Sequence, residues 1–205
     1  MIALNELIST YIFFFAVIDP IGTVPVFIAA TKGFNEREKR LIALKATLIA
    51  TCVLIFFVIA GELILTALNI PLAAFQVSGG IVLFLFALTM IFGEGKPESE
   101  INLTDKHTET AIFPLAIPSI ASPGAMLGAV MLTDKNYFNV YEQLETAFVM
   151  MIVLLNVLFF LLISTWINKK IGRSGASIIS RIMGFILASV AITSVLSGIQ
   201  DFYGL

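Results

Sequence analysis

The sequence predicts an all-α integral membrane protein with six transmembrane helices, and three observations lead to this fold class. The chain of 205 residues is 59% hydrophobic and only 13% charged, whereas about a quarter of the residues in a soluble domain are charged. Its mean hydropathy is +1.00. Six apolar stretches are long enough to cross a hydrocarbon core of about 30 Å. Because lipid satisfies no backbone polar groups and the stretches lack alternating polarity, we expect helices and not a β-barrel.

The spans are expected to form a single membrane domain covering residues 1–205, with one long polar stretch between two sets of three. The predicted spans are Leu4–Ala30, Leu41–Leu68, Ala73–Phe92, Ala111–Leu132, Leu144–Ile167 and Ile178–Ile199. The polar stretch, residues 93–110, is predicted to be a cytoplasmic linker. Before the second span, Asn35 to Glu38 has the pattern of a helix cap followed by an acidic first turn.

Basic residues are concentrated on connections that share one side of the membrane in a six-span protein. They are Lys32, Arg37, Lys39, Arg40, Lys45, Lys96, Lys106, Lys169, Lys170, Arg173 and Arg181. Only Lys135 lies on the other side. Since basic loops remain in the cytoplasm, we predict a multi-pass protein of the plasma (inner) membrane with both termini outside. Two re-entrant hairpins would place Lys169–Arg173 outside, against this rule, whereas a single hairpin is left open.

The first span contains an acid followed by a proline, Asp19-Pro20. Proline cannot continue an incoming helix, and it pushes the preceding residue out of the α region. The same pair is a typical helix start, with Asp as N-cap and Pro in the first position. We therefore predict that one helix ends near Ile18 and that a second begins at Pro20.

The fourth span contains three prolines and repeats this pattern. They are Pro114, Pro118 and Pro123. Ser122 is an N-cap residue type, and Pro123 follows it in the first helical position. The fourth span is therefore also predicted to be a broken helix.

The two breaks lie at matching places in an internal repeat. Pro123 follows Pro20 by 103 residues (123 − 20), and Gly184 follows Gly80 by 104 (184 − 80). The spacing predicts two pseudo-repeats, residues 1–92 and 111–200, of three spans each. Because three is odd, the second repeat is inverted relative to the first. Inverted repeats with broken helices indicate the central site of a secondary transporter.

A broken helix presents free N–H groups and a partial positive charge, which suit the carboxylate of a small substrate. The predicted substrate-binding residues are Asp19, Pro20, Gly22, Thr23, Ser122, Pro123, Gly124 and Ala125. The two glycines and Ala125 would keep the backbone approachable, and the two hydroxyl groups could donate hydrogen bonds. Asp19 could bind an ammonium group, cap its own helix, or take up a proton.

A second acid, Glu62, is the other candidate for ion or proton coupling. It is predicted to lie near a membrane interface, so a snorkelling or capping role is an equal alternative. Asn156, in the middle of the fifth span, is predicted to form an interhelical hydrogen bond.

Several functional classes are excluded or disfavoured by the residues present. No basic and aromatic pattern indicates a nucleic-acid partner. A single cysteine, Cys52, excludes an internal disulfide and a CxxC redox centre. The chain has no HExxH motif and no Ser–His pair within its spans. We therefore expect no enzymatic activity, no catalytic residues, no metal and no cofactor.

Motifs from both predicted halves resemble those of the MarC family. They are Asp19-Pro20-Ile21-Gly22 with Pro25, Thr31-Lys32-Gly33-Phe34 with Arg40, Gly79-Gly80, Pro114, Pro118, Pro123-Gly124-Ala125 and Arg181-Ile182-Met183-Gly184. The resemblance implies a six-span inner-membrane protein related to the LysE superfamily, some of whose members transport small neutral amino acids such as glycine and alanine. The family usually has Gly-Pro-Gly-Ala at the second break, where this chain has Ser122. That serine keeps a cap-capable residue and is expected to narrow the site or alter its selectivity.

The residues and the resemblance together predict a secondary transporter of small solutes, above all neutral amino acids, driven by a proton or sodium gradient. Its expected partners are a small-molecule substrate and the lipid bilayer, and a homo-oligomer is left open. The alternatives are a passive channel or pore and a membrane protein without transport activity.

Overall fold

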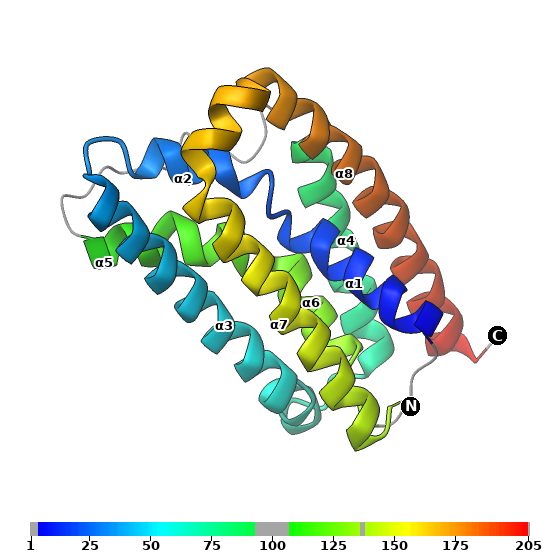
Figure 1. Cartoon of the computed structure of the whole chain (residues 1–205). Helices are drawn as coiled ribbons and strands as arrows, with labels where there is room; N and C mark the ends of the chain where they lie inside the picture. Colours follow the sequence, from blue (N-terminus) through cyan, green and yellow to red (C-terminus); the bar gives the residue numbers. More distant parts are fainter. Residues whose placement is uncertain (1–3, 93–106, 136–137, 205) are drawn as a thin grey trace.

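A computed structural model describes residues 4–92, 107–135 and 138–204, which are helical throughout apart from short turns and contain no strand (Figure 1). The elements are α1 (Leu4–Ile18), α2 (Thr23–Ala30), α3 (Glu36–Ala67), α4 (Leu72–Phe92), α5 (His107–Thr110), η2 (Ala111–Ile120), α6 (Pro123–Met131), α7 (Val140–Leu162) and α8 (Ser164–Tyr203). The all-α prediction is therefore confirmed. Of the predicted linker, residues 93–106 lie outside the described residues, and His107–Thr110 are helical.

Six stretches of the described chain are long and apolar enough to cross a membrane, if one bent pair of helices counts as a single span. Five are Leu4–Ala30, Glu36–Ala67, Leu72–Phe92, Val140–Leu162 and Ser177–Tyr203. The sixth combines Thr108–Ile120 with Pro123–Met131, which meet at an angle of 58°. Each stretch overlaps one of the six predicted spans.

The helices α3 and α7 begin with the same local structure. The side chain of Asn35 accepts hydrogen bonds from the N–H groups of Arg37 and Glu38, and Glu38 accepts one from the N–H group of Asn35. The prediction of a cap at Asn35 is therefore confirmed. Asn139 and Glu142 form the second such capping box, at the start of α7. These reciprocal bonds satisfy N–H groups that a helix start otherwise leaves free.

Helix α4 packs against the C-terminal part of α8, and glycines lie where the two helices meet. A methyl group on Gly80 would lie 3.0 Å from the carbonyl oxygen of Ala191, and one on Gly184 would lie 3.1 Å from that of Ala87. Small residues allow such close approach of two membrane helices. The glycines thus allow two helices that lie about a hundred residues apart in the chain to come into contact.

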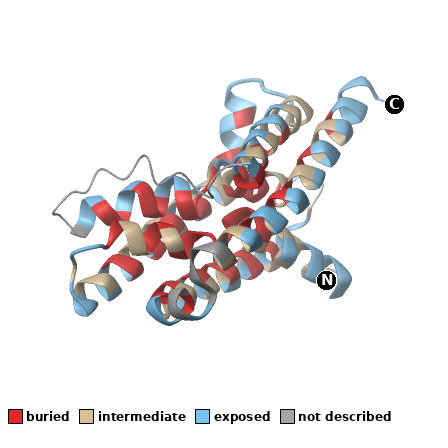
Figure 2. Ribbon diagram, turned by 90° about the horizontal axis from the view of Figure 1, so that it is seen from above, coloured by how far each residue is buried: buried red, intermediate tan, exposed pale blue. Residues whose placement is uncertain are grey.

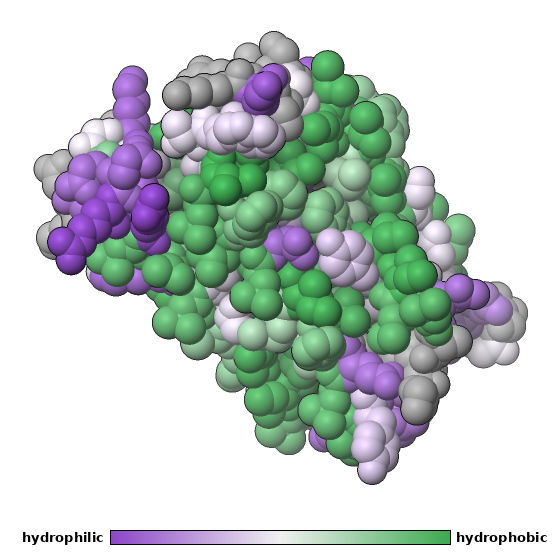
Figure 3. All heavy atoms as spheres, viewed as in Figure 1, coloured by the Kyte–Doolittle hydropathy of each residue, from purple (hydrophilic) through white to green (hydrophobic). Residues whose placement is uncertain are grey.

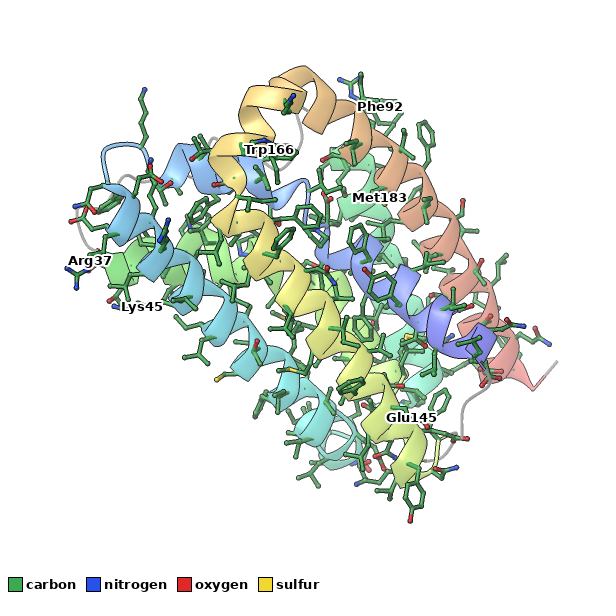
Figure 4. The ribbon with its side chains drawn as sticks, viewed as in Figure 1. Arg37, Lys45, Phe92, Glu145, Trp166 and Met183 are labelled. Atoms are coloured by element: carbon green, nitrogen blue, oxygen red, sulfur yellow. The ribbon has the colours of Figure 1, made fainter. Side chains whose placement is uncertain are left out.

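The buried residues lie on the faces that the helices turn toward one another (Figure 2). The face of the molecule seen in Figure 3 is apolar over a wide band, and hydrophilic groups gather at its upper left and lower right. Arg37 and Lys45 of α3 lie at one end of the bundle, and Glu145 of α7 lies toward the other (Figure 4). An apolar band between two polar ends is the surface expected of a protein that spans a bilayer.

Candidate functional site

The first break is a short turn between α1 and α2, which together form one candidate span, Leu4–Ala30. Helix α1 ends at Ile18 and α2 begins at Thr23, so the predicted start at Pro20 was three residues too early. Asp19 has a φ of 48°, in the left-handed region that Asp and Asn tolerate better than other side chains. Its N–H donates to the carbonyl of Phe15, and its own carbonyl accepts from the N–H of Thr23. The backbone hydrogen bonds of the span thus continue through the turn.

The carboxylate of Asp19 is enclosed by the protein, with only 1% of the residue exposed. Its Oδ1 accepts a hydrogen bond of 2.9 Å from the N–H of Gly22 within the turn. The N-cap of α2 is Gly22 and no side chain caps that helix, so the prediction of Asp19 as the N-cap was wrong. Its Oδ2 accepts one of 3.4 Å from the hydroxyl of Ser180 on α8. Sequence reasoning missed Ser180, because its only signal was a place beside the Arg181–Gly184 motif, which does not indicate the direction of its side chain.

The second break follows an irregular segment and matches its prediction closely. Within η2, Phe113 and Ile117 have extended backbone angles, and the peptide bonds that precede Pro114 and Pro118 are cis. Helix α6 then begins at Pro123 with Ser122 as its N-cap. The hydroxyl of Ser122 accepts a hydrogen bond of 3.1 Å from the N–H of Ala125. The cap-and-proline prediction is therefore confirmed here.

The two breaks lie in contact in the interior of the bundle. Ser122 donates a hydrogen bond of 3.1 Å from its hydroxyl to the carbonyl oxygen of Val17, two residues before Asp19. Thr23, at the start of α2, accepts one of 3.5 Å from the hydroxyl of Ser119. The structure thus brings together two regions that lie about a hundred residues apart in the chain. Of the eight predicted substrate-binding residues, all are buried except Pro123, which is exposed, and Glu62 is partly buried.

Protein atoms fill the space beside both glycines of the predicted site. A methyl group on Gly22 would collide with the carboxylate of Asp19 and lie 2.6 Å from the hydroxyl of Ser180. One on Gly124 would collide with Leu83 and lie 2.7 Å from Cγ1 of Val17. In this conformation the glycines therefore accommodate neighbouring side chains, and a ligand would reach either backbone only after those side chains move.

Glu62 lies near the end of α3 and is paired with Lys135. Its Oε2 is 3.6 Å from the Lys135 ammonium nitrogen and accepts a hydrogen bond of 3.3 Å from the Lys135 N–H. Ser122 lies at the start of α6, whereas Lys135 lies just after its end. The length of α6 therefore separates the Glu62–Lys135 pair from the breaks. The structure does not bring Glu62 to Asp19.

Two further points concern the predicted hydrogen bond of Asn156 and the presence of a metal site. Asn156 donates a hydrogen bond of 3.4 Å to the hydroxyl of Tyr11, which confirms the predicted interhelical bond. Among the residues for which positions are described, no three His, Cys, Asp or Glu side chains are placed to hold a metal ion.

Replacement of Ser122 by alanine is expected to destabilise the protein by about 1–2 kcal/mol, because a buried N-cap and its bond to Val17 are lost. Ser122→Gly is the matched variant, since glycine costs only a few tenths of a kcal/mol at an N-cap. Thermal unfolding in detergent measures both. Equal losses for alanine and glycine would show that the cap contributes little and that the bond to Val17 dominates.

Comparisons with known proteins identify the family. Residues 4–203 match the model of the MarC family integral membrane protein. A UPF0056 membrane protein of Buchnera aphidicola subsp. Schizaphis graminum is 33% identical over 201 residues, covering 98% of this chain and 99% of the relative. One of Aquifex aeolicus is 33% identical over 200 residues (95% and 92%), and the UPF0056 inner membrane protein YhgN of Escherichia coli K12 is 33% identical over 203 residues (96% and 98%). No solved structure shows a significant match. The chain belongs to the MarC family of integral membrane proteins.

Proposed function

We propose that this protein is a secondary transporter of small solutes, with neutral amino acids as its substrates. The observation that carries the proposal is the contact between the two helix breaks, with the buried carboxylate of Asp19 beside them. An ionisable residue within a membrane span costs a few kcal/mol to insert, and such residues usually mark a substrate or ion pathway. A role in the turn alone would not need a charge, since an uncharged asparagine tolerates the same backbone and accepts the same hydrogen bond.

An inverted repeat of residues 1–92 and 111–200 is supported by pairs of matching contacts. Gly80 contacts the Ala191 carbonyl, and Gly184 contacts that of Ala87. A shift of 104 residues (184 − 80 and 191 − 87) turns one contact into the other. The two capping-box asparagines are also 104 residues apart (139 − 35). In this arrangement the α1–α2 pair and the η2–α6 pair are equivalent broken spans, related by an axis in the membrane plane.

The chemistry of the breaks suits a zwitterion. The N–H of Gly124 at the start of α6 would bind its carboxylate, aided by the helix dipole. The N–H of Ala125 would join it after leaving the Ser122 hydroxyl. Asp19 would bind its ammonium group or carry the coupling proton. Because Leu83, Val17 and Ser180 now fill the spaces beside the two glycines, substrate binding requires the helices to move. Such movement around a central site is the alternating access of secondary transporters.

We further propose that the protein lies in the inner membrane with both termini outside. The relative from E. coli is named an inner membrane protein. The end of the bundle with Arg37 and Lys45 is the cytoplasmic end under the positive-inside rule. Glu62 remains a second candidate for coupling, although its pairing with Lys135 favours an interfacial ion pair.

Purified protein in liposomes is expected to catalyse saturable uptake and counterflow of glycine, alanine or serine, stimulated by a proton or sodium gradient. Counterflow measures exchange through an alternating site, because a passive channel gives non-saturating flux without it. Protein-free liposomes are the control. If no saturable flux arises with these amino acids under either gradient, the proposal of an amino acid carrier is wrong.

A further inference from the structure

A cavity of about 360 Å³ lies among four helices next to the second break. Its lining comes from α1, α4, α6 and α8: Phe13, Gln76, Leu83, Leu127, Gly128, Met131, Leu132, Ser189, Val190, Thr193, Ser194 and Ser197. This volume is at the lower end of the range of about 300–1,000 Å³ for small-molecule pockets. The cavity is therefore suited to a small solute with water.

The walls of the cavity differ in polarity. On one side α8 contributes hydroxyl groups, and Ser189, Thr193 and Ser197 follow one another at intervals of four residues, so they share one face of the helix. Gln76 of α4 adds an amide group. The hydroxyl groups of Ser189 and Thr193 donate to carbonyl oxygens one turn earlier in α8. Their oxygen atoms can still accept hydrogen bonds from water in the cavity.

Both chain termini lie at the same end of the bundle (Figure 1), and the lining residues place the cavity toward that end. Gln76 is in the second turn of α4, Met131 is the last residue of α6, and Ser197 is near the end of α8. All three helix ends lie on the side of the membrane opposite to the basic start of α3.

Leu83 separates the cavity from the second break. Its side chain lines the cavity and also occupies the position that a methyl group on Gly124 would take, at the start of α6. It is fully buried. The side chain of Leu83 therefore lies between the cavity and the backbone N–H groups that would bind a carboxylate. Val17 also lies beside Gly124.

On the other side of the breaks, α8 contacts the first break through Ser180. Ser180 follows Gln76 by 104 residues (180 − 76), so the two are equivalent positions in the proposed repeat. Ser180 contacts the carboxylate of Asp19, whereas Gln76 lines the cavity. The two equivalent positions thus differ in their surroundings, because Ser180 contacts the first break whereas Gln76 faces the cavity.

We propose that the cavity is a water-filled vestibule, open toward the side that holds both termini, and that Leu83 is the gate between it and the start of α6. The vestibule and the gate follow from the cavity itself. Only the nature of the solute, a small zwitterion, rests on the proposed function.

Thiol accessibility tests the vestibule. In a Cys52→Ala background, the cavity-lining variants Thr193→Cys and Ser197→Cys are compared with Ile192→Cys and Leu196→Cys, which replace exposed apolar residues of the same helix. The probe is a membrane-impermeant, cationic methanethiosulfonate added on the side of the termini. Because only a hydrated thiolate reacts, the cavity cysteines should be modified at least about tenfold faster than the others. Equal rates, as in a groove filled by lipid chains, would overturn the proposal.

A second set of variants tests the gate. Ser122→Cys, at the second break, should react slowly with the same reagent while Leu83 is present, and at least about tenfold faster after Leu83→Ala, because removal of its side chain opens a path for water. Leu54→Ala is the matched control, since Leu54 is equally buried but lies on α3. If Leu83→Ala fails to fold, Leu83→Val and Leu54→Val make the same comparison. If the Leu54 and Leu83 variants raise the modification rate of Ser122→Cys equally, or if neither raises it, Leu83 is not the gate.

These measurements need no transported solute. If the cavity cysteines react as expected but no amino acid flux is measured, the vestibule is supported and the transporter proposal is wrong. If flux is measured but the cavity cysteines do not react faster, the transporter is supported and the vestibule proposal is wrong.

Discussion

The Asp19→Asn variant is expected to fold normally and to lose ion-coupled transport. Asparagine tolerates the left-handed backbone that Asp19 adopts with its φ of 48°. Its side-chain oxygen can still accept the hydrogen bond from Gly22. The negative charge and the protonatable group are lost. If Asp19 pairs with a substrate ammonium group, removal of that charge costs about 3 kcal/mol, or a loss in affinity of about a hundredfold.

Companion variants separate the charge from the hydrogen bond to Gly22. Asp19→Gly keeps the backbone conformation but removes both, so it should also lose thermal stability in detergent. Ser180→Ala removes the hydrogen bond to Oδ2 and leaves the carboxylate, so its transport should be reduced much less than that of Asp19→Asn. Uptake and counterflow in liposomes, beside a melting curve for each variant, give the comparison. Full coupled transport by Asp19→Asn would mean that the residue only stabilises the turn.

The second large effect is expected at the packed surface of α4 and α8, where Gly184→Leu and Gly80→Leu should each destabilise the protein by about 3 kcal/mol, the upper end for overpacking. Neither position has room for a side chain, because backbone carbonyl oxygens of the facing helix lie about 3 Å from where its first carbon would be. Backbone cannot rotate aside as a side chain can, so the helices must separate. Thermal unfolding in detergent and the yield of folded protein measure the loss.

The control for this pair is Thr89→Leu, which places the same side chain on an exposed position of α4. It should be nearly neutral, since a lipid-facing position accepts leucine. Similar losses at Gly80 and Gly184 would also support the inverted repeat, because the two contacts are equivalent in it. A loss at one glycine only, or a loss at Thr89 as large as at either, would contradict the packing argument.

Features that depend on residues close together in the chain were predicted from the sequence. Ser122 caps α6 because its side chain needs only to reach the N–H three residues ahead. The cap at Asn35 follows from the same local geometry. At Asp19 the break was predicted, but α2 begins at Thr23 and not at Pro20. The backbone hydrogen bond from Thr23 to Asp19 holds the intervening residues in a turn, and no residue type in that turn indicates its length.

The sequence alone was sufficient for the membrane class, for six candidate spans and for the presence of a break at each proline pair, because hydrophobic run length and cap-and-proline pairs are local properties of the chain. Only the tertiary structure placed Ser180 on the carboxylate of Asp19 and Leu83 between a cavity and the start of α6. Those contacts depend on how far each helix is rotated about its axis and how closely it approaches its neighbour. Both are decided by the packing of small and large side chains from distant segments, such as Gly80 against Ala191, and not by the residues adjacent in the chain.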